Sequence, residues 1–142
     1  MKNNIVVPVN IESLSLISEF LQEKSILRHL PSRKMWEILL AVDEICCQII
    51  DIINNDQSEV NMNLIWENKE DKIIIKIQTE CFAFNPMEVE EDFTKNNEEH
   101  VLEGMELSLI KQMVDKVYYL RKNNQNILII EKLLKSKRNK CK

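Results

Sequence analysis

A glutamate and a glutamine one helical turn apart, Glu44 and Gln48, stand inside a hydrophobic stretch that runs from Met35 to Asn54. On a helical wheel at about 100° per residue, the apolar residues of this stretch cover nearly the whole circumference and leave one polar line. The line consists of Glu37, Ala41, Glu44, Gln48 and Asp51. Two interpretations stay open. The line is the solvent-facing edge of the helix, or it faces a cavity and directs Glu44 and Gln48 at what the cavity binds.

Other residue types that commonly carry chemistry form no recognisable site in the sequence. The four cysteines, Cys46, Cys47, Cys81 and Cys141, fit neither a disulfide framework nor a metal spacing, so we expect reduced thiols. Neighbouring helix positions point in different directions, which makes Cys46 and Cys47 a poor pair of metal ligands. The sequence contains no P-loop, nucleophile elbow or dinucleotide-binding fingerprint.

Length and charge narrow the function classes. A chain of 142 residues suits a single domain with one core, and 44% hydrophobic and 30% charged residues are ordinary for a soluble globular protein. The net charge of −4 argues against a dedicated nucleic-acid binder, which needs a basic face. No apolar run approaches the ~18 residues that span a bilayer, and the N-terminus lacks a signal pattern. We therefore expect a cytoplasmic protein without a membrane partner.

Hydrophobic patterning predicts a defined order of elements. Alternation from Val60 to Trp66 predicts a strand with one wet face, and the polar residues Asn123 and Asn124 predict a turn. Asn10 and Ser32 are expected to cap the two helices that follow them. The expected elements are a strand at 3–9, helices at 11–29 and 35–54, strands at 60–66 and 72–77, a helix at 105–116, and strands at 117–121 and 126–134.

This order implies a two-layer α/β (α+β) sandwich in which helices cover one face of a mostly antiparallel mixed sheet. We expect the helix at 35–54 to pack centrally on the sheet, with Phe20, Met35 and Trp36 in the core. Residues 1–134 are predicted to form one domain. The basic segment 135–142 is predicted to be a solvated, frayed tail, with a nucleic-acid role as the minor alternative.

Three segments carry a resemblance to a known family. They are Leu40-Ala-Val-Asp-Glu44 with Gln48, the segment Ile75 to Pro86, and the segment Glu103 to Val117. Within the second segment, Phe84-Asn85-Pro86 directly after a strand is typical of one kinase branch. From about Ile5 to Leu134 the chain resembles the anti-sigma-factor serine/threonine protein kinases, which belong to the GHKL class and have the Bergerat, or histidine-kinase-like ATPase, fold.

The resemblance implies roles for the residues on the central helix and the following strand. Glu44 corresponds to the general base of the family, and Gln48 takes the position at which an asparagine normally holds Mg²⁺. Thr79 replaces an aspartate that accepts a hydrogen bond from the adenine amino group, and a neutral hydroxyl makes a weaker bond. Cys81 replaces a glycine that lets adenine approach the backbone, so its side chain narrows the pocket.

The lid region that precedes the last helix is acidic. By the same resemblance, Gly104 retains one glycine of a pair, and Glu106 replaces the second. Triphosphates are cradled by backbone N–H groups at glycine-rich turns and helix N-termini, usually beside a cation. The lid offers only Lys95 and His100 as cations against the carboxylates of Glu98, Glu99, Glu103 and Glu106. These carboxylates either repel the phosphates of a nucleotide or interact favourably with the helix N-terminus and face water. In neither case do they form an anion-binding site.

Three functions are consistent with this sequence. The first is an anti-sigma regulatory factor that binds a sigma factor or an antagonist protein, with its binding of ATP and Mg²⁺ weakened or lost. The second is an active ATP-dependent kinase that phosphorylates a serine on the antagonist. The third, a fragment of a histidine kinase, is disfavoured because no phosphoacceptor helix pair precedes the domain. A homodimer is expected from the resemblance, and direct contact with nucleic acid is not.

Overall fold

The structure is a computed structural model that describes residues 3–56, 59–81 and 108–134. Its elements are β1 (Asn4–Pro8), α1 (Ser13–Leu27), α2 (Ser32–Asp56), β2 (Asn61–Asn68), β3 (Lys72–Glu80), β4 (Lys116–Lys122) and β5 (Gln125–Leu133). A further helical segment at 108–113 precedes β4. Every strand predicted within the described residues is present, and the boundaries differ by a few residues.

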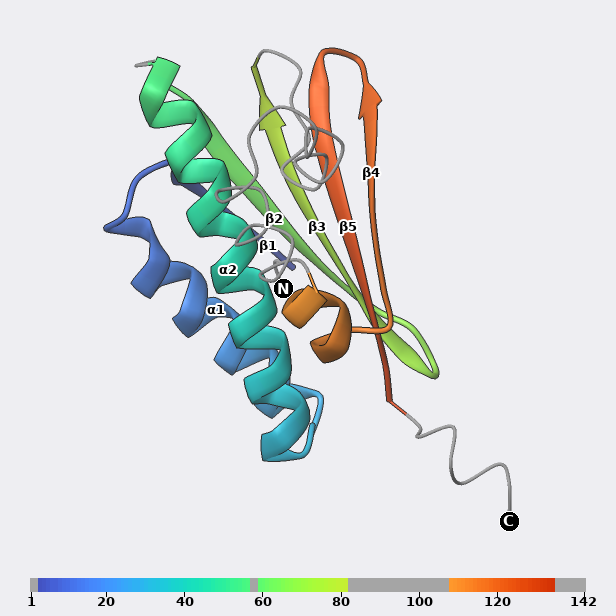
Figure 1. Ribbon diagram of the computed structural model, residues 1–142. Coiled ribbons are helices and arrows are strands. Elements are labelled where there is room, and N and C mark those ends of the chain that lie inside the picture. Colours follow the sequence, from blue (N-terminus) through green and yellow to red (C-terminus); the bar gives the residue numbers. More distant parts are fainter. Residues whose placement is uncertain (1–2, 57–58, 82–107, 135–142) are drawn as a thin grey trace.

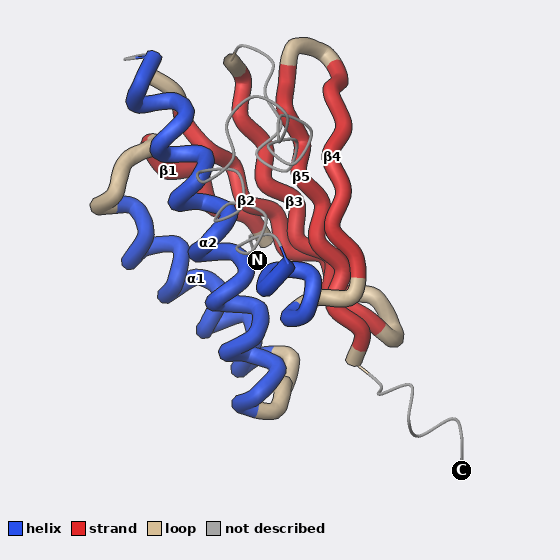
Figure 2. Tube along the Cα trace, viewed as in Figure 1, coloured by secondary structure: helices blue, strands red, loops and turns tan. Residues whose placement is uncertain are grey.

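The strands form one sheet in the order β1-β2-β3-β5-β4, and each described pair of neighbours is antiparallel. Both long helices lie on the same face of this sheet, with α2 over its middle and α1 beside β1 (Figures 1 and 2). The predicted two-layer sandwich of helices on an antiparallel sheet is therefore confirmed. Among the described helices, none has the length and apolar character needed to cross a membrane.

The core lies between α2 and the sheet. Alternate residues of β2 and β3 point into it, as the period of two in a half-buried strand requires, and Leu64, Trp66 and Ile75 are almost fully buried. The helix contributes a broad apolar face that includes Ile38, Val42 and Ile45. Each such side chain stabilises the fold by about 1.5–3 kcal/mol relative to its exposed state. The expectation that the helix at 35–54 is central is thus correct.

Two expectations about this helix are wrong. Ala41, assigned to the polar line, is completely buried, because its direction from the axis falls inside the arc that faces the sheet. Trp36, expected in the core, is 54% exposed, and its neighbour one turn on, Leu40, is 51% exposed. Phe20 and Met35 do pack against the core, although they remain partly exposed. The sheet and α1 therefore cover less of α2 than its apolar circumference suggests.

Local signals explain where the elements end. Asn10 accepts a hydrogen bond from the Ser13 N–H through Oδ1 at 3.0 Å, so it organises the turn before α1 while the helix itself starts at Ser13. His29 has a φ of 61°, and the adjacent amides bond back to α1 in the pattern of a Schellman cap.

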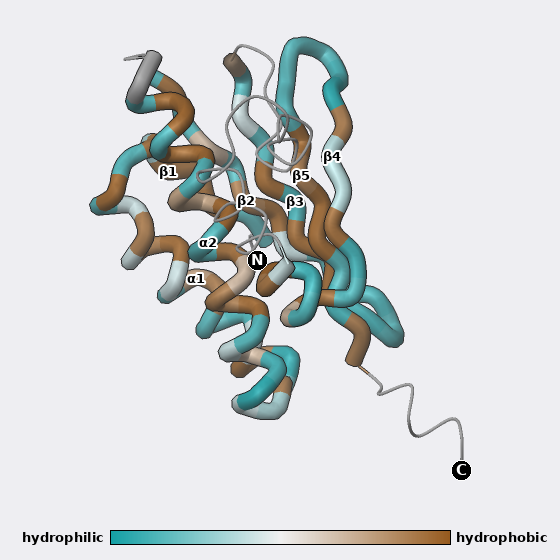
Figure 3. The backbone as a smooth tube through the Cα atoms, viewed as in Figure 1, coloured by the Kyte–Doolittle hydropathy of each residue, from teal (hydrophilic) through white to brown (hydrophobic). Residues whose placement is uncertain are grey.

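The hairpin between β4 and β5 turns on Asn123 and Asn124, both with positive φ, as a type I′ turn needs. The predicted turn is confirmed, and asparagine serves here in a chain whose single glycine, Gly104, lies elsewhere. This turn is hydrophilic, whereas the middle of β5 is hydrophobic (Figure 3).

Candidate functional site

One flank of α2 carries the polar residues that the sequence singled out. Glu37, Glu44 and Gln48 are all partly buried, and their spacing of seven and four residues places them within about 40° of one another around the helix. Asp51, the last member of the predicted line, is exposed. The contacts of Glu37 with β5 show which way this flank faces. It faces β5, on the side of α2 opposite to α1.

A buried lysine fixes this flank to the sheet. Lys132 on β5 donates a hydrogen bond from Nζ to Glu37 Oε1 at 2.7 Å, and its side chain is only 8% exposed. It also donates to the backbone carbonyl of Met113, at the end of the helical segment 108–113. Burial raises the pKa of Glu37, but the hydrogen bond and the charges of Lys132 and Arg33 outweigh it, so the pKa lies below its usual value. Lys132 therefore joins three elements around the start of the polar flank.

Thr79, which the resemblance assigns to the adenine end of the site, lies near the end of β3. It continues the inward series of β3 and is 2% exposed. In the sheet register it stands between Met62 on β2 and Asn126 on β5, which share its face. Figure 1 shows that α2 covers one face of the sheet. Thr79 is buried on that face with the other inward residues of β3, so it lies on the side of the sheet that carries α2, the helix of Glu44 and Gln48.

Around Cys81 the structure reveals residues that the sequence did not identify. Asn126 is 4% exposed and donates a hydrogen bond from Nδ2 to Cys81 Sγ at 3.6 Å. Its Oδ1 accepts hydrogen bonds from Tyr119 at 2.7 Å and from Arg121 Nη1 at 3.1 Å. Arg121 Nη1 also donates to the backbone carbonyl of Cys81 at 2.8 Å. A polar network from β4 and β5 thus holds the chain where β3 ends.

The signal that could have found this network was the pairing of strands. The turn at Asn123 and Asn124 fixes the register of β4 against β5, which puts Arg121 opposite Asn126. The further step, Asn126 opposite Thr79, depends on the pairing of β3 with β5. These two strands are separated in sequence by the acidic region, so no local pattern specifies their register.

Part of the predicted site lies outside the described residues. Gly104 and Glu106 do so, together with the acidic residues before them. The prediction that Glu44, Gln48, Thr79, Cys81 and Gly104 line one concavity therefore stays a prediction. The structure places Glu44, Gln48 and Thr79 on one side of the sheet. Cys81 directly follows the end of β3.

The described residues provide a poor donor set for Mg²⁺ and ATP. In the described part of the chain, no three histidine, cysteine or acidic side chains gather as metal ligands. Gln48 offers an amide oxygen, but its extra methylene shifts that oxygen relative to asparagine, and Mg²⁺ tolerates little departure from octahedral distances. Thr79 brings no charge to the base end of the site.

The cysteines in the described residues form no disulfide bond. Cys46 is fully buried on α2, and burial raises the pKa of its thiol far above the usual range. A thiol in that state is a core side chain rather than a nucleophile.

Comparison with known proteins adds one positive finding. The sequence model of the histidine kinase-like ATPase domain matches residues 7–132. This range contains every described element except the first residues of β1 and the last residue of β5. A search of curated proteins found no match for the chain.

Proposed function

The chain belongs to the histidine kinase-like ATPase domain family, and from this premise we propose that it is an anti-sigma regulatory factor with weakened or lost nucleotide binding. In this proposal it acts in the cytoplasm by binding a sigma factor or an antagonist protein, and it forms a homodimer. Domains of this family generally bind ATP with Mg²⁺. The proposal therefore separates two properties, a regulatory fold and a nucleotide site.

The observation that carries the proposal is the neutral residue at the base end of the site. Thr79 is buried on the face covered by α2, at the position that the resemblance assigns to an adenine-binding carboxylate. A hydrogen bond to a charged acceptor is about twice as strong as a neutral one, so its loss weakens base binding. Next to it, the side chain of Cys81 occupies the place of a glycine.

A second candidate, an active ATP-dependent serine kinase, is supported by Glu44. This carboxylate is retained at the position of the general base, partly buried, one turn before Gln48 and on the flank directed towards β5. A protein that no longer transfers phosphate has no need for a general base, so the glutamate at this position favours an active kinase. The two candidates therefore differ in a measurable property, the affinity for ATP.

Calorimetric titration of the purified chain with ATP, with and without Mg²⁺, separates them. The loss of the charge-assisted bond is expected to cost about 1–3 kcal/mol, which moves a micromolar site towards the millimolar range. The variant Thr79→Asp, Cys81→Gly, Glu106→Gly should recover at least about tenfold in affinity. Glu44→Gln in the same background is the matched control, because it alters a proposed catalytic group and not the base end.

Micromolar binding of ATP by the unmodified chain would overturn the proposal, whatever the triple variant does. Circular dichroism of the triple variant is needed beside the titration, because a carboxylate at the buried position 79 can destabilise the fold. The regulatory half of the proposal has its own test. The purified chain should repress transcription by RNA polymerase with one of the sigma factors of its own organism, in the absence of nucleotide.

A further inference from the structure

The side-by-side packing of α1 and α2 leaves a groove on their outer surface with a volume of about 160 Å³. We call it the α1–α2 groove. On α2 its lining residues are centred about 110° around the helix from Glu37, Glu44 and Gln48, on the side that faces α1. Its lining is formed by Leu14, Ile17, Ser18 and Leu21 of α1 and by Trp36, Leu39, Leu40 and Asp43 of α2.

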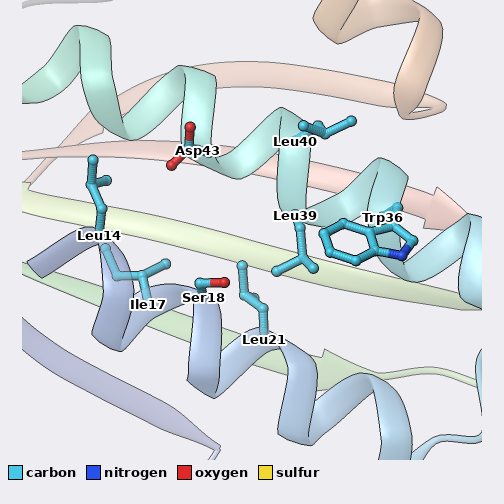
Figure 4. Close-up of a pocket in the computed structure, with 8 residues that line it drawn as sticks. All are labelled: Leu14, Ile17, Ser18, Leu21, Trp36, Leu39, Leu40 and Asp43. Carbon is cyan, nitrogen blue, oxygen red and sulfur yellow. The ribbon is translucent and has the colours of Figure 1, made fainter.

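The exposure of these side chains changes from the floor of the groove to its rim. Ile17, Leu21 and Leu39 form a buried floor, whereas Trp36 and Leu40 on the α2 rim are each more than half exposed. Figure 4 shows Leu39 between the two helices, with Trp36 towards one end and with Asp43 and Leu14 towards the other. An apolar floor beside an exposed tryptophan is typical of a protein-binding surface, because tryptophan is enriched among the residues that dominate binding energy.

The polar residues of the groove specify the charge of its occupant. The Ser18 hydroxyl already accepts a hydrogen bond from Gln22 Nε2 at 3.1 Å. Asp43 is exposed, and within the described residues its carboxylate forms no ion pair or hydrogen bond. A lysine or arginine of a partner would therefore gain a charge partner without breaking a contact inside this chain.

The spacing along α2 specifies the shape of the occupant. Trp36, Leu40 and Asp43 follow one another at intervals of four and three residues, so they line two turns, about 10 Å, of one helix flank. A second helix laid in the groove presents side chains at the same intervals. We propose that the α1–α2 groove binds an amphipathic helix of a partner protein, with aliphatic side chains against Trp36 and Leu39 and a lysine or arginine at Asp43.

A second copy of this chain is a poorer occupant. The outer face of α1 exposes Leu16 and Ile26, but it also exposes Glu19 and Glu23 between them. In a copy docked through that face, these carboxylates would meet Asp43, and like charges brought together oppose binding. A basic helix from a different protein avoids this repulsion.

This inference rests on the proposed function in one respect, since it takes the partner to be a protein. It does not depend on nucleotide, because none of the residues that line the groove is one that the resemblance assigns to the nucleotide site. The titration with ATP and the transcription measurement can therefore fail while the groove still binds a helix. Conversely, the groove can fail to bind a helix while the titration and the transcription measurement give the expected results.

The test uses the full chain and a synthetic probe. The probe is a capped helical peptide of alanine and glutamine with leucines at i and i+4 and arginine at i+7, and its counterpart carries glutamate at i+7. Binding is followed by tryptophan emission. Trp66 is 1% exposed and its Nε1 donates to Asn68, so a shift to shorter wavelength reports on Trp36. For variants without Trp36, binding is followed by the anisotropy of a labelled peptide.

We expect the arginine peptide to bind and the glutamate peptide to bind about tenfold more weakly. Asp43→Lys should reverse this preference, and Trp36→Ala should reduce the affinity for both by about tenfold or more. Two matched controls should leave binding unchanged. They are Asp51→Lys, which reverses another exposed charge of α2, and Leu16→Ala, which removes an exposed leucine from the outer face of α1.

Four outcomes would overturn the inference. The first is no binding of either peptide, and the second is binding that Trp36→Ala and Asp43→Lys leave unchanged. The third is binding of vesicles or a fatty acid at this surface with loss of the peptide preference. The fourth is self-association of the chain, measured by analytical ultracentrifugation, that Asp43→Lys alters while the peptides do not bind.

Discussion

The two flanks of α2 differ in how their polar and apolar residues are used. On the flank towards β5, Glu37 is held by a buried lysine, and the same lysine reaches the carbonyl of Met113. On the flank towards α1, Trp36 and Leu40 are exposed, and Asp43 has no polar partner in the described residues. On the first flank, the charge of Glu37 is paired with Lys132 inside the molecule. On the second flank, the apolar surface of Trp36 and Leu40 and the charge of Asp43 remain accessible to another molecule.

One helix can therefore support the fold on one flank and offer a binding surface on the other. The contacts of Lys132 are buried, so they stabilise the relative positions of α2, β5 and the segment 108–113. Contacts of that kind are expected to matter for folding. The residues of the α1–α2 groove rim contribute little to folding and are expected to matter for binding. Three measurements of the free energy of unfolding test this division between the flanks.

The largest effect is expected from Lys132→Met. This change removes a buried ammonium and leaves Glu37 Oε1 and the carbonyl of Met113 without their donor, which should cost about 2–3 kcal/mol of the free energy of unfolding. Chemical denaturation measures the loss. Lys69→Met is the control, because the contact of this exposed side chain with the partly buried Glu67 spans 3.9 Å and should contribute less than about 0.5 kcal/mol. Equal losses in the two variants would remove the distinction between the flanks.

A smaller effect is expected from acid. The folded pKa of Glu37 is below the ordinary value of 4.5, so this carboxylate contributes stability above that pH and loses it as the pH falls through the folded pKa. The difference in free energy of unfolding between the unmodified chain and Glu37→Gln should be about 1 kcal/mol near neutrality and should shrink below about pH 4.5. A difference that stays constant from neutral pH to pH 3 would show that Glu37 is not held as a charged partner of Lys132.

The smallest effect is expected on the open flank. Trp36→Ala should change the free energy of unfolding by only about 0.5 kcal/mol, because the side chain is more exposed than buried. Thermal denaturation followed by circular dichroism gives this value without relying on tryptophan fluorescence. A loss of 2 kcal/mol or more would mean that Trp36 supports the packing of α1 on α2, and the groove would then be part of the core.

The sequence predicted the fold well where the signals are local. The alternation of Met62, Leu64 and Trp66 with polar residues identified both β2 and its buried face. The pair Asn123 and Asn124 identified the last hairpin, because asparagine tolerates the left-handed backbone that the turn requires. Each of these signals lies within a few residues of the feature that it predicts.

Predictions failed where neighbouring elements decide the outcome. The circumference of α2 is apolar almost all round, so its sequence alone could not show that Ala41 faces the sheet and Trp36 faces outwards. Which residues of α2 are exposed depends on how much of its surface α1 covers. Likewise, the network of Asn126, Arg121 and Cys81 exists because three strands are placed in one register, and no single segment encodes it. For Gly104 and Glu106, which lie outside the described residues, the predicted roles remain predictions.

The pairing of the strands has a consequence for the length of the chain. Glu80, at the end of β3, lies opposite Gln125, whereas the amide of Asp115, just before β4, bonds to the carbonyl of Glu131. These two levels of β5 are about 20 Å apart, a distance that about seven extended residues can span. A connection much shorter than the segment 82–107 would therefore be long enough to join the two strands. Because closing a loop of twice the length costs only about 0.6 kcal/mol more, changes in the length of the segment 82–107 should be tolerated better than insertions or deletions within the sheet.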